Sequence, residues 1–113
     1  MKKITFIGAG SFSFTSNLVS DILRFPAFQD LEIALMDIDE ERLNFINQAC
    51  RIIAAKLKHP VKITTHTDRR KALEGANGVL CTILQGGVDV FKLDVEIPKK
   101  YGVDINVGDT RGP

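Results

Sequence analysis

The sequence lacks an excess of charge of one sign and lacks a long hydrophobic run. Its 113 residues include 15 Lys and Arg and 14 Asp and Glu, so the formal net charge is +1. This balance argues against nucleic-acid and membrane-surface partners, which need clustered positive charge. No apolar run approaches the ~18 residues of a membrane-spanning helix, and no signal-peptide pattern follows Met1. We therefore expect a protein with neither nucleic-acid nor membrane partners.

Cysteine and histidine are also scarce. The two cysteines, Cys50 and Cys81, belong to no CxxC pair, which indicates a reducing compartment and a cytoplasmic location. Both fall at apolar positions and are predicted to be core residues. His59 lies beside Pro60 at a predicted helix end, and we predict that its side chain is solvated. His59 and His66 have no partner at metal-ligand spacing, so we predict no metal ligands in this chain.

Short apolar runs alternate with helical patterns along the chain. Strands are predicted over residues 3–7, 31–36, 61–65 and 79–84. Helices are predicted between the 8–11 turn and Pro26, over about 40–58 after the capping residue Asp39, from Thr67 or Asp68 to about Leu73, and over much of 88–101. We expect Pro98 to limit the last of these.

Strands that alternate with helices imply parallel strands joined by right-handed crossovers. Four strands with three or four helices fill one half of a doubly wound sheet, so the predicted fold is α/β, Rossmann-type. Residues 1–113 are then one Rossmann-like domain. The ending at 108–113 resembles the middle of a loop, so we expect the front part of a longer chain.

The turn after the first strand has the start of a dinucleotide-binding fingerprint. Gly8 and Gly10 match the first two glycines of G-x-G-x-x-G, and Ser13 replaces the third. Two glycines permit a tight turn and a close approach to a pyrophosphate, which the following helix N-terminus would favour. We therefore predict cofactor contacts from Gly8, Gly10, Ser11 and Phe12. A simple strand-to-helix turn is the alternative.

An acid ends the second strand, where a carboxylate can accept hydrogen bonds from an adenosine ribose. Asp37 lies 24 residues after Ser13, slightly farther than usual. An acid there repels a 2′-phosphate, and no arginine follows directly, so NAD is predicted rather than NADP. The alternative is a helix-capping or turn acid, a role that Asp39 fits better.

Two further loops carry polar candidates. Gln85 follows the fourth strand, at the edge where this architecture binds ligands, and is predicted to meet the cofactor or the substrate. Asp109, Thr110 and Arg111 lie between Gly108 and Gly112. They suit sugar hydroxyls, and they equally suit a plain turn with an internal ion pair.

Several of these segments together resemble glycoside hydrolase family four. They are 8–11 (GAGS), 35–39 (LMDID), Gly86-Gly87, Ile97-Pro98, Tyr101-Gly102 and 108–113 (GDTRGP). The ending is the most specific, and it looks like the branch that acts on unphosphorylated sugars, such as α-galactosidases and α-galacturonidases. The likeness covers essentially the whole chain.

The resemblance implies an NAD- and manganese-dependent glycosidase. In this family NAD takes a hydride from C3 of the sugar, the C2 proton is removed, and the glycosidic bond breaks by elimination before the hydride returns. Asp109, Thr110 and Arg111 would face the sugar. A homo-oligomer is expected for the full-length protein.

The family's metal ligands and catalytic base lie beyond residue 113, so no catalytic residue is predicted here and the 113-residue chain alone should be inactive. Two other hypotheses stay open. One is an NAD-dependent 2-hydroxy-acid dehydrogenase of the lactate/malate type, against which the lack of an arginine in 85–87 speaks. The other is a stand-alone, non-catalytic nucleotide-binding module.

Overall fold

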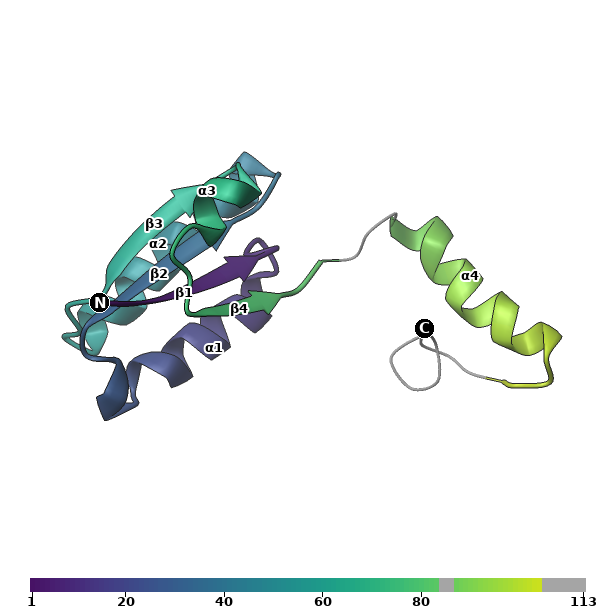
Figure 1. The fold of residues 1–113 in the computed structure, drawn as a ribbon, viewed down its shortest axis with the longest axis horizontal. Coiled ribbons are helices and arrows are strands. Elements are labelled where there is room, and N and C mark those ends of the chain that lie inside the picture. Colours follow the sequence, from purple (N-terminus) through teal and green to yellow (C-terminus); the bar gives the residue numbers. More distant parts are fainter. Residues whose placement is uncertain (84–86, 105–113) are drawn as a thin grey trace. The chain divides into compact units, whose positions relative to one another are not determined.

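A computed structural model describes residues 1–83 and 87–104 of the chain. The chain divides into two compact units, Met1–Ile83 and Leu84–Pro113. The first unit is a parallel sheet with helices on both faces, drawn in purple to green in Figure 1. In the second unit, the described residues form one helix.

The elements alternate as the sequence predicts. The strands are β1 (Lys2–Ile7), β2 (Leu31–Met36), β3 (Lys62–His66) and β4 (Gly78–Cys81). The helices are α1 (Phe12–Leu23), α2 (Glu40–Lys56), α3 (Arg69–Leu73) and α4 (Gly87–Lys100), with a single 3₁₀ turn at Pro26–Phe28. None of the helices in the described ranges is long and apolar enough to cross a membrane.

The four strands form one parallel sheet in the order β3-β2-β1-β4. Thr5 of β1 lies beside Ala34 of β2 and Val79 of β4. The chain therefore moves outward to β3 on one side and then crosses to the other side of β1 to form β4. This topology confirms the predicted α/β Rossmann-type sheet, because its strands are parallel and its order changes direction at β1.

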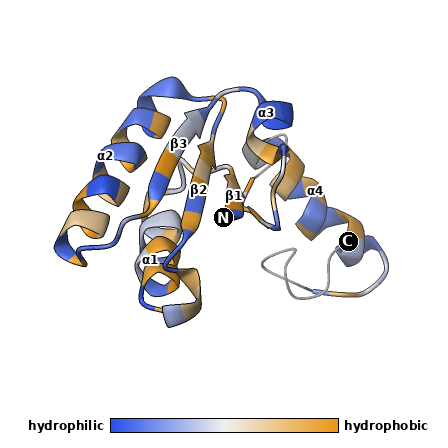
Figure 2. Ribbon diagram, turned by 60° about the vertical axis from the view of Figure 1, so that its left-hand side comes forward, coloured by the Kyte–Doolittle hydropathy of each residue, from blue (hydrophilic) through white to orange (hydrophobic). Residues whose placement is uncertain are grey.

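The main core lies between the sheet and helices α1 and α2. Alternate side chains of β1 and β2 enter it, together with one apolar stripe from each helix. Its fully buried members include Phe6, Ile33, Leu35, Val19, Ile46 and Cys50. Apart from Glu32, the residues of β2 are apolar, because both faces of this central strand are covered. The strand is drawn with orange and blue sections in Figure 2.

The short helix α3 covers part of the opposite face. Ala72 is fully buried there against Ile7 and Met36. The hydroxyl of Thr5 is also fully buried and donates to the Ala72 carbonyl at 2.7 Å. Because this carbonyl ends a helix, the bond satisfies a group that has no partner within the helix.

Two helices end in the same left-handed turn. At the end of α2, Lys58 has φ +52°, and the amides of Lys58 and His59 donate to the carbonyls of Ala55 and Ala54. At the end of α4, Gly102 has φ +80°, and the amides of Gly102 and Val103 donate to the carbonyls of Lys99 and Pro98. Both are Schellman motifs, in which glycine is the favoured left-handed residue. Helix α4 runs through Pro98 to Lys100.

Two sequence-based interpretations were wrong. Cys81 is exposed in β4, because Leu80 faces the core and successive strand residues face opposite sides of a sheet. His59 is not a freely solvated side chain: its ring bonds the Phe28 carbonyl at 2.9 Å and accepts from the Val61 amide at 3.0 Å. It joins the end of α2 to the segment before β2.

Candidate functional site

The glycine turn between β1 and α1 is fastened to the carboxyl end of β2. The amides of Gly8 and Ala9 both donate to the Met36 carbonyl at 2.9 Å. Gly8 has φ +84°, and a Cβ at this position would lie 2.7 Å from the Thr82 carbonyl oxygen. Both the conformation and the close pass to the end of β4 therefore require glycine.

The second glycine lies directly against the acid that ends β2. The Gly10 amide donates to Asp37 Oδ2 at 2.8 Å, across 27 residues of sequence. A Cβ on Gly10 would lie 2.6 Å from that oxygen and 2.9 Å from the Cβ of Arg42. The structure therefore brings Gly10 and Asp37 into contact, and the contact leaves no room for a side chain on Gly10.

Asp37 is half-buried, and its two carboxylate oxygens have different partners. Oδ2 faces the glycine turn, whereas Oδ1 accepts from the Asp39 amide at 2.9 Å. Asp39 is the residue that caps α2, with its own carboxylate accepting from the Arg42 amide at 3.1 Å. The preference for Asp39 as the capping acid is confirmed. A carboxylate offers about four lone-pair sites, so Asp37 can accept further hydrogen bonds.

The N-terminus of α1 opens beside this contact. The first amides of a helix, here those of residues 12–14, have no partner within the helix and carry a partial positive charge. Asp39 and Asp68 cap α2 and α3 through their side chains. In the described part of the chain, Ser11 at the start of α1 makes no such bond, so the α1 amides are available to an anion.

Phe12 begins α1, and its side chain packs on a neighbouring helix. Its ring centroid lies 5.3 Å from that of Phe45 of α2, and both rings are exposed. The ring therefore packs against α2, while the Phe12 amide belongs to the helix N-terminus described above. Phe12 can offer a backbone donor to an anion whatever its ring contacts.

Two residues next to the turn were missed by the sequence analysis. Thr82 follows β4, and its hydroxyl donates to the Gly8 carbonyl at 3.0 Å. Arg42 lies in the first turn of α2, beside Gly10. The Asp39 cap could have placed Arg42 in that first turn, but no sequence signal places it against a glycine 32 positions earlier.

The remaining predicted site residues lie outside the described residues. These are Gln85, Asp109, Thr110 and Arg111. Within residues 1–83 and 87–104, no three His, Cys, Asp or Glu side chains are grouped as a metal site would require. Burial raises the pKa of Cys50 to about 11, so this thiol stays protonated and serves as a small core residue.

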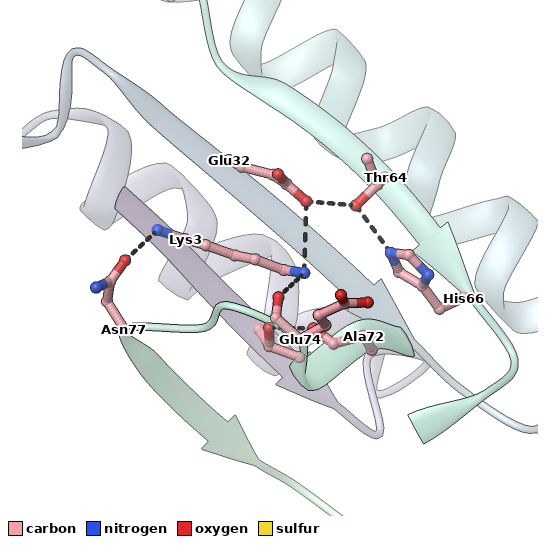
Figure 3. A network of polar contacts seen from close by, with 8 residues as sticks. Lys3, Glu32, Thr64, His66, Ala72, Glu74 and Asn77 are labelled. Atoms are coloured by element: carbon pink, nitrogen blue, oxygen red, sulfur yellow. Dashed lines mark hydrogen bonds and ion pairs between the residues drawn. The ribbon is translucent and has the colours of Figure 1, made fainter. Parts of the chain in front are cut away.

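A second polar cluster lies on the face of the sheet that α3 covers (Figure 3). Lys3 Nζ donates to the Glu74 carbonyl at 2.7 Å and lies 3.8 Å from Glu32 Oε2. Glu32 also accepts from Thr64, whose hydroxyl lies 3.0 Å from His66 Nε2. The cluster joins β1, β2 and β3 to the end of α3. Burial and the Lys3 charge lower the pKa of His66.

Comparison with known proteins gives a consistent set of relatives. The model of the family 4 glycosyl hydrolases matches residues 3–113. An alpha-galactosidase of Rhizobium meliloti (strain 1021) is 45% identical over 96% of this chain and 22% of its own length. An alpha-galactosidase of Bacillus subtilis (strain 168) is 40% identical over 99% of this chain and 26% of its own length. This chain thus spans about a quarter of the length of these curated relatives.

A solved structure shows the same fold. The 6-phospho-beta glucosidase from Thermotoga maritima, determined with manganese, NAD+ and glucose-6-phosphate, superposes with a TM-score of 0.70. It is 28% identical, and the match covers 92% of this chain and 24% of that one. The Rossmann-type fold therefore agrees with that of an enzyme solved with NAD+.

Proposed function

This chain belongs to family 4 of the glycosyl hydrolases, and from that premise we propose that it is the NAD-binding part of a glycosidase that cleaves unphosphorylated α-glycosides. The observation that carries the cofactor assignment is the contact between Gly10 and Asp37 beside the uncapped start of α1. It brings a donor-rich helix end and a carboxylate acceptor together at the carboxyl edge of a parallel sheet. A dinucleotide needs both, one for its pyrophosphate and one for a ribose.

The residues of the turn provide contacts of the kind that a dinucleotide needs. Gly8, Gly10, Ser11 and Phe12 would lie against the pyrophosphate. The amides of Gly8, Gly10 and Ser11 already have partners within the protein, so the donors to the pyrophosphate would be the free amides at the start of α1, that of Phe12 among them. Asp37 would accept from the ribose hydroxyls while it keeps Gly10 in place. Gln85, which follows β4, would meet the cofactor or the substrate.

The sugar site would be completed by other parts of the protein. We propose that Asp109, Thr110 and Arg111 contact sugar hydroxyls, and that the ligands for a divalent metal, manganese by analogy with relatives, lie outside this chain. The chemistry that bound NAD supplies in such an enzyme is a reversible hydride shift at C3 of the sugar. The role of the present residues is to bind and orient the cofactor, not to move protons at the substrate.

Two of the relatives support the proposed substrate class. The proteins with 45% and 40% identity are both named alpha-galactosidases, which supports an α-galactosidase-like activity on unphosphorylated sugars. The balanced charge and the sparse cysteines support a cytoplasmic protein without nucleic-acid or membrane partners. A homo-oligomer is proposed for the full-length protein.

The test is an assay of the full-length protein with a nitrophenyl α-galactoside, manganese and NAD. The proposal expects cleavage that requires both additions and leaves no net NADH, and weaker cleavage of the corresponding 6-phosphate. NADH that accumulates with a 2-hydroxy acid, without glycoside cleavage, would favour a dehydrogenase instead. NAD binding with neither activity would favour a nucleotide-binding module.

A further inference from the structure

An arginine stands beside the acid that is proposed to hold the adenosine ribose. A Cβ on Gly10 would lie 2.6 Å from Asp37 Oδ2 and 2.9 Å from the Cβ of Arg42. The Asp37 carboxylate and the base of the Arg42 side chain are therefore neighbours over the same glycine. One group bears a negative charge and the other carries a positive charge on a long stem.

The guanidinium of Arg42 is held only loosely. Its Nε lies 3.6 Å from Asp39 Oδ2, and the two side chains are 72% and 49% exposed. An exposed pair of this kind adds little to stability, so a better anionic partner can compete with Asp39. The guanidinium has five N–H donors in a planar fork that matches phosphate oxygens.

These two groups would meet the same part of a bound dinucleotide. If Asp37 accepts from the 2′-hydroxyl of the adenosine ribose, Arg42 stands next to the 2′ position from the α2 side. A 2′-phosphate would be repelled by Asp37 and attracted by Arg42. The acid alone therefore does not set how strongly NADP is rejected.

We propose that Arg42 is a second specificity-determining residue, which faces the 2′ position together with Asp37 and reduces the discrimination against a 2′-phosphate. This inference rests on the proposed NAD site. The preference for NAD over NADP then depends on two opposed charges. Removal of the Arg42 charge should increase this preference, and removal of the Asp37 charge should decrease it.

The test measures NAD and NADP affinities of the full-length protein by titration. Arg42→Ala should weaken NADP binding by about fivefold and leave NAD binding within about twofold, which is the scale of one exposed charge contact. Arg42→Lys keeps the charge and should restore most of the NADP affinity. Arg24→Ala, at the opposite end of α1, makes the same change in net charge and should leave the ratio of affinities unchanged.

Asp37→Ser provides the second half of the test. It should bind NADP more tightly than the unaltered protein does, and Arg42→Ala added to it should remove most of that gain. Melting temperatures of all variants separate a folding defect from a change in recognition. If Asp37→Ser does not fold, the comparison of Arg42→Ala with Arg42→Lys still decides the matter.

The outcomes separate this inference from the proposed function. An unaltered protein that binds neither cofactor would refute the NAD site itself. An unaltered protein that binds NAD, with NAD and NADP weakened equally or not at all by Arg42→Ala, would refute only the role of Arg42. A ratio of affinities that widens in Arg42→Ala and recovers in Arg42→Lys supports the role, because a purely structural residue would change both affinities together.

Discussion

Replacement of Asp37 by alanine should weaken both the fold around the glycine turn and the binding of NAD. The carboxylate accepts from the Gly10 amide at 2.8 Å and from the Asp39 amide at 2.9 Å. A hydrogen bond to a charged group contributes roughly 1.5–3 kcal/mol. The Asp39 amide is exposed and would regain water, so mainly the part-buried bond to Gly10 is lost. We expect the free energy of unfolding to fall by about 2 kcal/mol.

The loss of NAD affinity should come from a different bond. In the proposed site the same carboxylate accepts from a ribose hydroxyl, which is again a bond to a charged group. Its loss corresponds to about 10- to 100-fold weaker NAD binding. The assay is a titration with NAD at a temperature where thermal melting shows the variant to be fully folded.

Asp39→Ala is the matched control, because it removes an acid that lies two positions after Asp37 and has a different structural role. Asp39 caps α2, and the loss of a cap costs about 1 kcal/mol of stability. This variant should therefore melt at a lower temperature and still bind NAD within about twofold of the unaltered protein. Unchanged NAD affinity in Asp37→Ala, or equal losses of affinity in the two variants, would show that Asp37 is only a turn residue.

Three further predictions concern stability. Lys58→Gly should raise the free energy of unfolding by about 1 kcal/mol in urea denaturation, because Lys58 holds a left-handed conformation that Gly102 adopts in the equivalent turn; no gain would mean that the lysine side chain compensates for the strain. Thr5→Val should cost about 1–3 kcal/mol, since it leaves the carbonyl of Ala72 without its buried donor; a cost below 0.5 kcal/mol would mean that water replaces the hydroxyl. The lowered pKa of His66 means that the folded state favours the neutral ring. The contribution of His66 to the free energy of unfolding is therefore fully present above about pH 6.5. It is lost as the pH falls below that value, because the unfolded chain takes up the proton before the folded protein does. His66→Gln should flatten this part of the pH profile of the denaturation midpoint, and an unchanged profile would assign it to other groups.

Local patterns were sufficient for most of the secondary structure. The alternation of apolar runs with helical periods predicted the four strands and four α-helices seen in the described residues, with boundaries that differ from those observed by a few residues. The capping role of Asp39 was also correct, and of the two candidates Thr67 and Asp68 the structure has Asp68 as the cap of α3. These features depend on residues within a few positions of one another, and the sequence shows such neighbours directly.

The site was predicted only in part. The glycine spacing and the acid after the second strand placed Gly10 and Asp37 at the same edge of a parallel sheet. Their direct hydrogen bond, the close pass of Gly8 to Thr82 and the position of Arg42 over Gly10 were not foreseen. Each depends on how far two elements approach one another, which is set by the packing of many side chains and not by spacing along the chain.

The sequence by itself determined which segments become strands and helices, where the helices begin, and which strand carries the glycine turn. Periodicity and caps act over a single turn or a single strand, so they can be read without a partner. Only the tertiary structure decided the strand order β3-β2-β1-β4, the exposure of Cys81 and the cluster of Lys3, Glu32 and His66. The physical reason is that strand pairing and helix packing join residues tens of positions apart, and their energies depend on contacts that exist only after the sheet has formed.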